Sequence, residues 1–359
     1  MHAAIASLKG RGTPSRIPGR FDPILRSREP DGWASVPEAP EPGRQELLPE
    51  QARSIIARND SPDVPFSQSV NPYRGCEHGC VYCYARPSHG YLDLSPGLDF
   101  EQRIRFKVNA PELLDRELSR STYRCEPLAI GSNTDAYQPA EAELGLTRKL
   151  LEVCLAHRQP VSIVTKSALV LRDIDILQAL SEQGLCHVYL SVTTLDDELK
   201  RRLEPRTASG RARLRVVTEL AARGIPTGVL VAPVIPALND SGIERILALA
   251  AAAGARKAGW ILLRLPHEVA PLFRQWLAEH YPERAAHVMS LLQQMRGGRD
   301  NDPRFGSRMR GAGAFATLFS QRFRVAARRA GLDGRDWPTL DTTRFVGAEP
   351  RSARQLSLI

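Results

Sequence analysis

The sequence predicts an α/β fold, a partial (β/α)6 barrel of the TIM type with a helical, basic C-terminal extension. Apolar segments of strand length alternate with segments of helical periodicity from about residue 67 to residue 265. The apolar runs are continuous, which is typical of parallel strands whose sheet is covered on both faces. Polar side chains follow directly after several of these runs, where barrels of this type carry their chemistry.

Six strands are expected along this part of the chain. The first is an extended run at 66–73, which leads into a loop with three cysteines. The other five are apolar runs, at 128–131, 161–165, 188–192, 227–231 and 260–265. Helical patterns lie in the gaps between them, at 140–156, 169–183, 210–223 and 241–253. Strands that alternate with helices in this way predict a parallel sheet.

The two ends of the chain differ from this central part. Residues 1–60 are rich in Pro, Gly, Arg and Glu, and we expect a mostly irregular arm with a short helix at 50–57. The barrel is expected over 61–268, and a basic helical extension that covers its mouth over 269–335. Within that extension, a glycine-broken loop at 296–311 precedes a helix near 314–330. Residues 336–359 are expected to form a loose tail.

The formal net charge of +9 is unevenly placed. Between Arg296 and Arg329 there are nine arginines and no lysines, with only Asp300 and Asp302 against them, a net +7. Such a surface favours a polyanionic partner, although arginine-rich helices are also common in high-GC bacterial proteins. No apolar run reaches the length of a membrane span, and the first thirty residues lack a signal-type stretch. We therefore expect no membrane partner and a cytoplasmic location.

Three cysteines, Cys76, Cys80 and Cys83, lie on one short loop with the spacing C-x3-C-x2-C. Their thiolates can hold three irons of a 4Fe–4S cluster, because cysteine thiolate is the usual cluster ligand. No fourth cysteine is nearby, so one iron would stay open to another ligand. Gly75 and Gly79 give the loop the backbone freedom to wrap such a group.

Zinc is the alternative ligand for cysteines at such short spacing, with His78 or His89 as a fourth ligand. A zinc knuckle usually pairs C-x2-C with a second cysteine pair a dozen or more residues later. No second pair follows here.

The cysteine spacing, with the aromatic Tyr82 before the last cysteine, resembles the signature of the radical S-adenosylmethionine (radical SAM) superfamily. The order of further motifs resembles the branch of spore photoproduct lyase and its DNA-repair-lyase-like relatives, over roughly 66–270. Those motifs are Val164-Thr-Lys166, the strand end at Ser191, Glu204-Pro205 with Thr207, and Val231-Ala-Pro-Val-Ile235. The resemblance implies a 4Fe–4S cluster on three cysteines, SAM bound at the open iron, and a flavodoxin- or ferredoxin-type one-electron reductant.

The same resemblance implies roles for residues at the strand ends. Lys166 would pair with the SAM carboxylate, and Ser191 would bond the ribose hydroxyls, although it could equally cap the next helix. Tyr82 would pack near the adenine or simply belong to the core. Three residues after the second strand would bind the amino end of SAM: Ser132, Asn133 and Asp135. Asp135 could instead cap the helix that starts near residue 140.

One position departs from that branch. Spore photoproduct lyases use a cysteine at the end of the second strand as a hydrogen-atom donor, and this chain has Ser132 there. Three further cysteines, Cys125, Cys154 and Cys186, are expected to be buried structural thiols. The lyase route of thymine-dimer repair is therefore not expected.

Three functions remain open from the sequence. The first is a radical SAM enzyme that abstracts hydrogen from nucleic acid, with phosphates and a base held by the loop after the barrel. The contacts would be Arg304, Phe305, Arg308 and Arg310. The second is the same chemistry on a protein or small molecule. The third is a zinc-stapled nucleic-acid-binding protein without catalysis.

Overall fold

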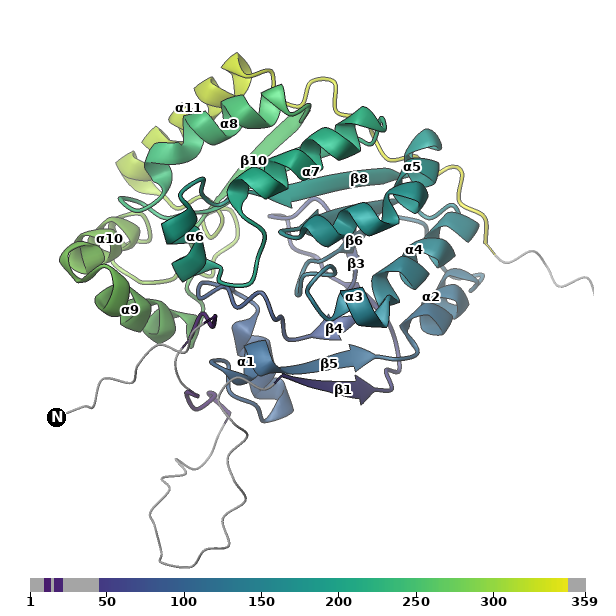
Figure 1. Ribbon diagram of the computed structural model, residues 1–359, viewed down its shortest axis with the longest axis horizontal. Helices are drawn as coiled ribbons and strands as arrows, with labels where there is room; N and C mark the ends of the chain where they lie inside the picture. The colour runs from purple at the N-terminus through teal and green to yellow at the C-terminus, as the bar shows by residue number, and fades with distance from the viewer. Residues whose placement is uncertain (1–9, 14–15, 22–44, 348–359) are drawn as a thin grey trace, which may run out of the picture.

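A seven-stranded sheet forms the centre of the computed structural model, which describes residues 10–13, 16–21 and 45–347 (Figure 1). Its strand order is β10-β9-β8-β7-β6-β3-β2, and all neighbours are parallel except β2 and β3. The strands are β2 (Ile56–Arg58), β3 (Gln68–Val70), β6 (Leu128–Ile130), β7 (Val161–Thr165), β8 (Cys186–Ser191), β9 (Thr227–Val234) and β10 (Lys257–Leu262). The six predicted parallel strands are thus confirmed, in chain order.

Helices follow the strands as the sequence predicts. The predicted helix at 140–156 is split in two at Gly145, whose φ of 61° ends one helix before the next begins. The helices of this layer are α3 (Glu141–Leu144), α4 (Leu146–Ala156), α5 (Ile174–Glu182), α7 (Gly210–Ala222) and α8 (Ile243–Ala252). α4 contacts α5 and α7 contacts α8, so the helices lie side by side along the sheet (Figure 1).

A second, three-stranded sheet was not predicted. It pairs β1 (Glu46–Glu50) with β5 (Arg103–Lys107) in parallel and β5 with β4 (Tyr73–Arg74) in antiparallel orientation. The predicted helix at 50–57 is wrong, because β1 and β2 occupy its two ends. Where β2 begins, the backbone N–H groups of Ile55 and Ile56 donate hydrogen bonds to the carboxylate of Glu117. Glu117 is distant in the sequence, so the local pattern could not reveal this partner.

Short elements connect these sheets: η1 (Arg86–Leu92), α1 (Asp99–Gln102), α2 (Ala110–Leu118), η2 (Ala168–Asp173), α6 (Asp197–Leu203) and η3 (Asp240–Gly242). The C-terminal part forms α9 (Val269–His280), α10 (Pro282–Gln294) and α11 (Gly313–Arg329). Among the residues that the structure describes, no helix is both long and apolar enough to cross a membrane.

The described part of the predicted tail packs against the rest of the protein. The prediction of a loose tail is therefore wrong for the residues up to 347. Trp337 contacts the rings of His187 and Tyr189 on β8, with centroid distances of 4.5 and 5.2 Å. Phe345 lies against Tyr123 at 5.3 Å. Aromatic burial of this size outweighs the polar composition around it.

Candidate functional site

The cysteine loop follows β4 and is held from both sides by backbone hydrogen bonds. The N–H of Cys76 donates to the carbonyl of Phe100 at 2.9 Å, and the N–H of Val81 donates to Leu203 at 3.1 Å. Cys76 and Cys80 are buried, and Cys83 is half-buried. The three thiols are close enough to influence one another electrostatically.

The loop fits a group that three thiolates surround. Gly75 and Gly79 have φ values of 84° and 65°, which only glycine adopts readily. A Cβ on Gly79 would lie 2.7 Å from Oε2 of Glu101, so the loop has no room for a side chain there. Within the described residues, no three His, Cys, Asp or Glu side chains converge as a single metal ion requires. In a cube held by three cysteines each thiolate would bind a different iron, so the three sulfurs would surround the group and need not meet at one point.

Burial raises the pKa of the Cys80 thiol to about 12, and the nearby charge of Lys166 opposes this rise. Burial alone would lower the pKa of Lys166. The sulfur of Cys80 and the carboxylates of Glu204 and Asp135 oppose this effect, so the pKa of Lys166 is raised and its side chain stays cationic. The backbone N–H of Lys166 donates to Asp135, whose carboxylate also contacts His78 of the cysteine loop, so this lysine lies close to the loop.

Asp135 joins three parts of this site. Its carboxylate lies 3.2 Å from Nδ1 of His78 in the cysteine loop and accepts the backbone N–H of Lys166 at 2.8 Å and the hydroxyl of Thr165 at 2.7 Å. Burial would raise the pKa of Asp135, but His78 and these hydrogen bonds hold it well below its usual range. Both oxygens thus have protein partners. Through these contacts Asp135 connects the ends of β6 and β7 to the cysteine loop.

Glu204 is the centre of a second buried network, which was not predicted. It accepts hydrogen bonds from the hydroxyls of Tyr82 and Thr193 and pairs with the guanidinium of Arg213. Burial would raise its pKa, but Arg213 and Lys166 lower it to about 2. Tyr82 is thus fixed through its hydroxyl, which neither of the two predicted roles for this residue required.

The predicted residues after β6 contact Asn71 and Tyr84, and Ser191 at the end of β8 reaches the Glu204 network through Arg213. Ser132 accepts a hydrogen bond from the side chain of Asn71 at 3.2 Å, and its carbonyl accepts one from the hydroxyl of Tyr84. The N–H of Asn133 donates to Asn71 at 2.9 Å. Ser191 is buried, and its carbonyl accepts Arg213 at 2.8 Å. The ends of β3, β6, β7 and β8 therefore meet at the cysteine loop.

Comparison with known proteins identifies this arrangement. Residues 70–250 match the family model described as Radical SAM superfamily. The chain belongs to the radical SAM superfamily and is an enzyme. This finding removes the alternative of a non-catalytic zinc-stapled protein.

Relatives of this radical SAM enzyme include uncharacterised proteins of Mycobacterium bovis and Mycobacterium tuberculosis. Each is 39% identical over 233 residues, which span 64% of this chain and 68% of the relative. The structure is also similar to spore photoproduct lyase complexed with dinucleoside spore photoproduct, with a TM-score of 0.58 and 19% identity over 79% of both chains. A spore photoproduct lyase mutant with bound AdoMet gives a TM-score of 0.57, with the same identity and coverage. The likeness to these lyases is one of fold.

In this radical SAM enzyme the remaining thiols lie away from the cysteine loop. Cys154 and Cys186 are buried, and Cys125 is half-buried beside Gln159, with Sγ 3.6 Å from its side-chain oxygen. Burial raises the pKa of Cys154 to about 12 and keeps it protonated. Ser132 stands at the end of β6 as expected, so none of these three cysteines takes the donor position there.

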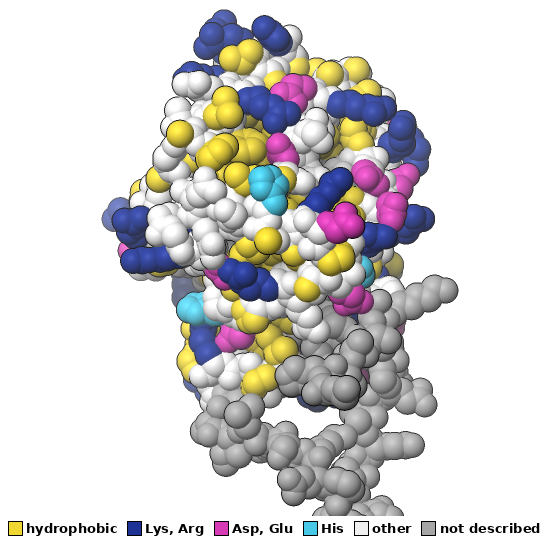
Figure 2. All heavy atoms as spheres, turned by 90° about the vertical axis from the view of Figure 1, so that its left-hand side faces the viewer, with side chains coloured by type: hydrophobic (Ala, Val, Ile, Leu, Met, Phe, Trp, Pro, Cys, Tyr) yellow, Lys and Arg dark blue, Asp and Glu magenta, His cyan; other side chains and the backbone are white. Residues whose placement is uncertain are grey.

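The predicted substrate arginines each have a partner within the protein. Arg304 pairs with Asp302 at 2.9 Å, and Arg308 pairs with Asp63 at 2.5 Å and lies over the ring of Phe305. Arg310 lies over the ring of Trp260 at 4.6 Å. On the face seen in Figure 2, Lys and Arg side chains are scattered among acidic and apolar ones rather than gathered in one patch. Two of these three arginines therefore have a carboxylate partner, and the third is packed on an aromatic ring.

One arginine that the sequence analysis missed lies directly at the site. Arg264 follows β10, and its Cζ lies 5.5 Å from the ring centroid of Tyr84. Tyr84 is the residue directly after Cys83 in the sequence. Among the described residues its buried Nε has no hydrogen-bond partner, and its Nη1 donates to the sulfur of Met309 at 3.9 Å. A charged residue at the carboxyl end of an apolar strand was the signal for it, since the same rule picked out Lys166.

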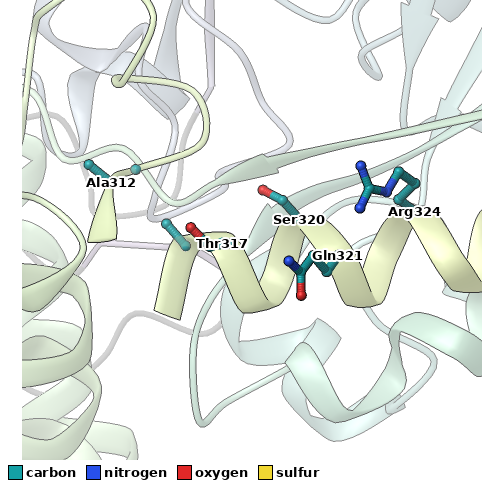
Figure 3. A pocket seen from close by; sticks show the side chains of 7 residues that line it. Ala312, Thr317, Ser320, Gln321 and Arg324 are labelled. Carbon is teal, nitrogen blue, oxygen red and sulfur yellow. The ribbon is translucent and has the colours of Figure 1, made fainter. Parts of the chain in front are cut away.

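A separate pocket of about 260 Å³ lies along α11, with Thr317, Ser320, Gln321 and Arg324 on one face of the helix (Figure 3). Neither the cysteines nor the predicted SAM contacts line it. It is therefore distinct from the candidate active site.

Proposed function

We propose that the enzyme holds a 4Fe–4S cluster on Cys76, Cys80 and Cys83 and binds SAM at the iron without a cysteine. One observation carries the proposal: a buried three-cysteine loop lies where the ends of several parallel strands meet, beside the cation Lys166. When bound, the cluster and SAM supply reductive cleavage to a 5′-deoxyadenosyl radical, which abstracts hydrogen from the substrate. A flavodoxin- or ferredoxin-type protein would provide the electron.

The chain's own residues divide into those that bind and those that position. Lys166 binds the SAM carboxylate, since it is cationic and adjacent to the cysteine loop. Ser191 faces the ribose, and Ser132 and Asn133 the amino end. Asp135 holds the lysine and the cysteine loop together rather than binding SAM, because its oxygens are already bonded. Tyr82 is positioned in the same way by Glu204, and its ring remains the proposed contact for adenine.

We propose further that the sheet is the partial (β/α)6 barrel of the superfamily, with the domain limits 61–268 and 269–335. The loop at 296–311 supports a closed side. The N–H of Leu262 on β10 donates to the carbonyl of Met309 at 2.9 Å. Arg308, one residue before, pairs with Asp63 in the β2–β3 connection. β10 and β2 are the two edge strands of the sheet, so this loop connects the two edges. An extension that covers the opening of a partial barrel would make the same connection.

For the substrate we propose an anion, with nucleic acid as the favoured class. The support is Arg264, which lies at the site without an acidic partner among the described ion pairs and in contact with Tyr84. A guanidinium beside an aromatic ring suits a phosphate next to a base. The arginine loop supports this less than its composition suggested, because Arg304 and Arg308 are paired. An acidic protein or small molecule is the alternative substrate.

The experiment is anaerobic reconstitution of the full chain with iron and sulfide, followed by SAM, dithionite and an assay for 5′-deoxyadenosine. We expect product and a brown protein in the wild type, and neither above background in Cys80→Ala. Cys154→Ala is the matched control, since that buried thiol is on α4 and not in the cysteine loop, and it should behave as the wild type. Zinc uptake without iron, or no SAM cleavage with any reductant, would contradict the proposal.

A further inference from the structure

A short N-terminal segment, residues 10–13, lies directly on the outside of the cysteine loop. Gly12 and Thr13 are buried there, although they are more than sixty residues away from the loop in sequence. A Cβ on Gly12 would lie 1.7 Å from the carbonyl oxygen of Gly79 and 3.2 Å from the backbone nitrogen of Val81. The two glycine backbones are therefore in contact, with no room for a side chain between them. Figure 1 draws this part of the chain in purple near α1.

Glu101 on α1 binds this segment through three hydrogen bonds. Its Oε2 accepts the N–H of Gly12 at 3.0 Å, its Oε1 accepts the hydroxyl of Thr13 at 3.2 Å, and its backbone carbonyl accepts the guanidinium of Arg11 at 3.1 Å. Glu101 is fully buried and Arg11 is half-buried, so these bonds satisfy Glu101 oxygens that have no water around them.

The same carboxylate leads on to a cysteine. Oε1 of Glu101 also pairs with the buried guanidinium of Arg86 at 2.5 Å. Nε of Arg86 in turn donates to the carbonyl of Cys80 at 3.0 Å. A continuous series of contacts thus runs from Thr13 through Glu101 and Arg86 to Cys80. In addition, the backbone of Gly12 contacts Gly79, the residue before Cys80.

From these contacts we propose that Arg11, Gly12 and Thr13 form an outer wall of the cluster site, which holds the cysteine loop in place and keeps water from the Gly79–Cys80 peptide. The inference rests on the proposed function, because it assigns the loop to a cluster. Solvent exposure and hydrogen bonding around a cluster govern its reduction potential, and exposure governs how fast it is lost to oxidants. These residues position the loop and do not touch the reacting atoms.

The test uses the full-length variant Gly12→Ala, whose added methyl group cannot fit against Gly79. Gly242→Ala is the matched control, because Gly242 has an ordinary φ of −87° and a Cβ there would meet only the side chain of Ile246, at 3.9 Å. The first readout is the rate at which a maleimide labels Cys80 in the metal-free protein, followed by peptide mass spectrometry. Cys154 serves as an internal reference for global unfolding. We expect Cys80 labelling to rise about tenfold in Gly12→Ala, with Cys154 labelling unchanged.

The second readout is made on protein reconstituted with iron and sulfide. Gly12→Ala should take up the same iron as the wild type, bleach several times faster in air, and show a shifted midpoint potential. Thr13→Val, which loses the hydroxyl and keeps the shape, should move both readouts in the same direction by less. Thr13→Ser, which keeps the hydroxyl, should give wild-type values in both readouts. If Gly12→Ala does not fold, the difference between these two Thr13 variants tests the inference.

Equal Cys80 labelling in Gly12→Ala and Gly242→Ala would overturn the inference. So would a parallel rise of Cys80 and Cys154, which would indicate general destabilisation. Failure of the wild type to bind iron would instead contradict the proposed function, and the labelling experiment on metal-free protein would still test the wall by itself.

Discussion

Charged side chains around the cysteine loop and those in the loop at 296–311 have different surroundings. Glu204 and Arg213, near the cysteines, are both about 1% exposed, and each has several partners. Arg304 is 70% exposed, and within the described part of the chain its one ion pair is with Asp302. Burial makes a charge expensive to leave unpaired, whereas water screens an exposed pair. The few buried charges near the cysteine loop should therefore contribute more to stability, per residue, than the many exposed charges of the arginine-rich segment.

The largest effect should come from breaking the buried pair. Glu204→Gln leaves Arg213 as an uncompensated buried cation, so we expect the free energy of unfolding to fall by about 3–5 kcal/mol. Urea denaturation of the full chain measures it. Glu198→Gln is the control, because Glu198 pairs with Arg202 on the surface and should cost at most about 0.5 kcal/mol. Equal losses in the two variants would remove the distinction between the regions.

The pH dependence of stability sharpens the same point. The pKa of Glu204 is lowered to about 2 in the folded protein, from an ordinary value near 4.5. A depressed carboxylate pKa stabilises the folded state above the unfolded-state value and loses this contribution as the pH falls toward the folded value. Wild-type stability should therefore drop between about pH 4.5 and pH 2 more steeply than that of Glu204→Gln. Parallel pH profiles of the two proteins would contradict this assignment.

Much of the fold was predictable because its signals are local. The six parallel strands are continuous apolar runs, and their side chains, such as Ile163, Val188 and Val229, are fully buried. The second sheet was missed because its strands are short and charged, and because β1 and β5 are brought together from segments more than fifty residues apart. Sequence periodicity carries no information about such pairing.

The site was predictable in part, for a similar reason. The cysteines and Lys166 stand in motifs or at strand ends that the chain itself displays. Glu204 was noticed only through a family motif, and its partners Tyr82 and Arg213 lie 122 and 9 residues away. Contacts of this kind depend on the packed fold, as do those of Gly12 with Gly79.

A smaller effect is expected for the cation at the site. Lys166→Met should weaken SAM binding by about 10- to 100-fold, the size of one charge-assisted hydrogen bond, and leave iron content unchanged. Anaerobic calorimetric titration of the reconstituted protein measures it. The exposed Lys149→Met is the control and should bind SAM as the wild type does. Unchanged affinity in Lys166→Met would place the SAM carboxylate elsewhere.

The smallest effects separate the two kinds of arginine. Arg264→Gln should weaken binding of a single-stranded oligothymidylate of about ten nucleotides roughly tenfold and lower the salt dependence by about one phosphate contact. Arg304→Gln, which loses a solvent-exposed side chain already paired with Asp302, should change affinity less than about twofold. Fluorescence anisotropy at several salt concentrations measures both. SAM cleavage without substrate should stay at the wild-type rate in each variant, because neither residue is placed among the SAM contacts. If Arg304→Gln weakens binding more than Arg264→Gln, the oligonucleotide is held by the arginine loop and not by the site at the cysteine loop. If neither variant affects binding, the substrate is not a nucleic acid bound through these residues.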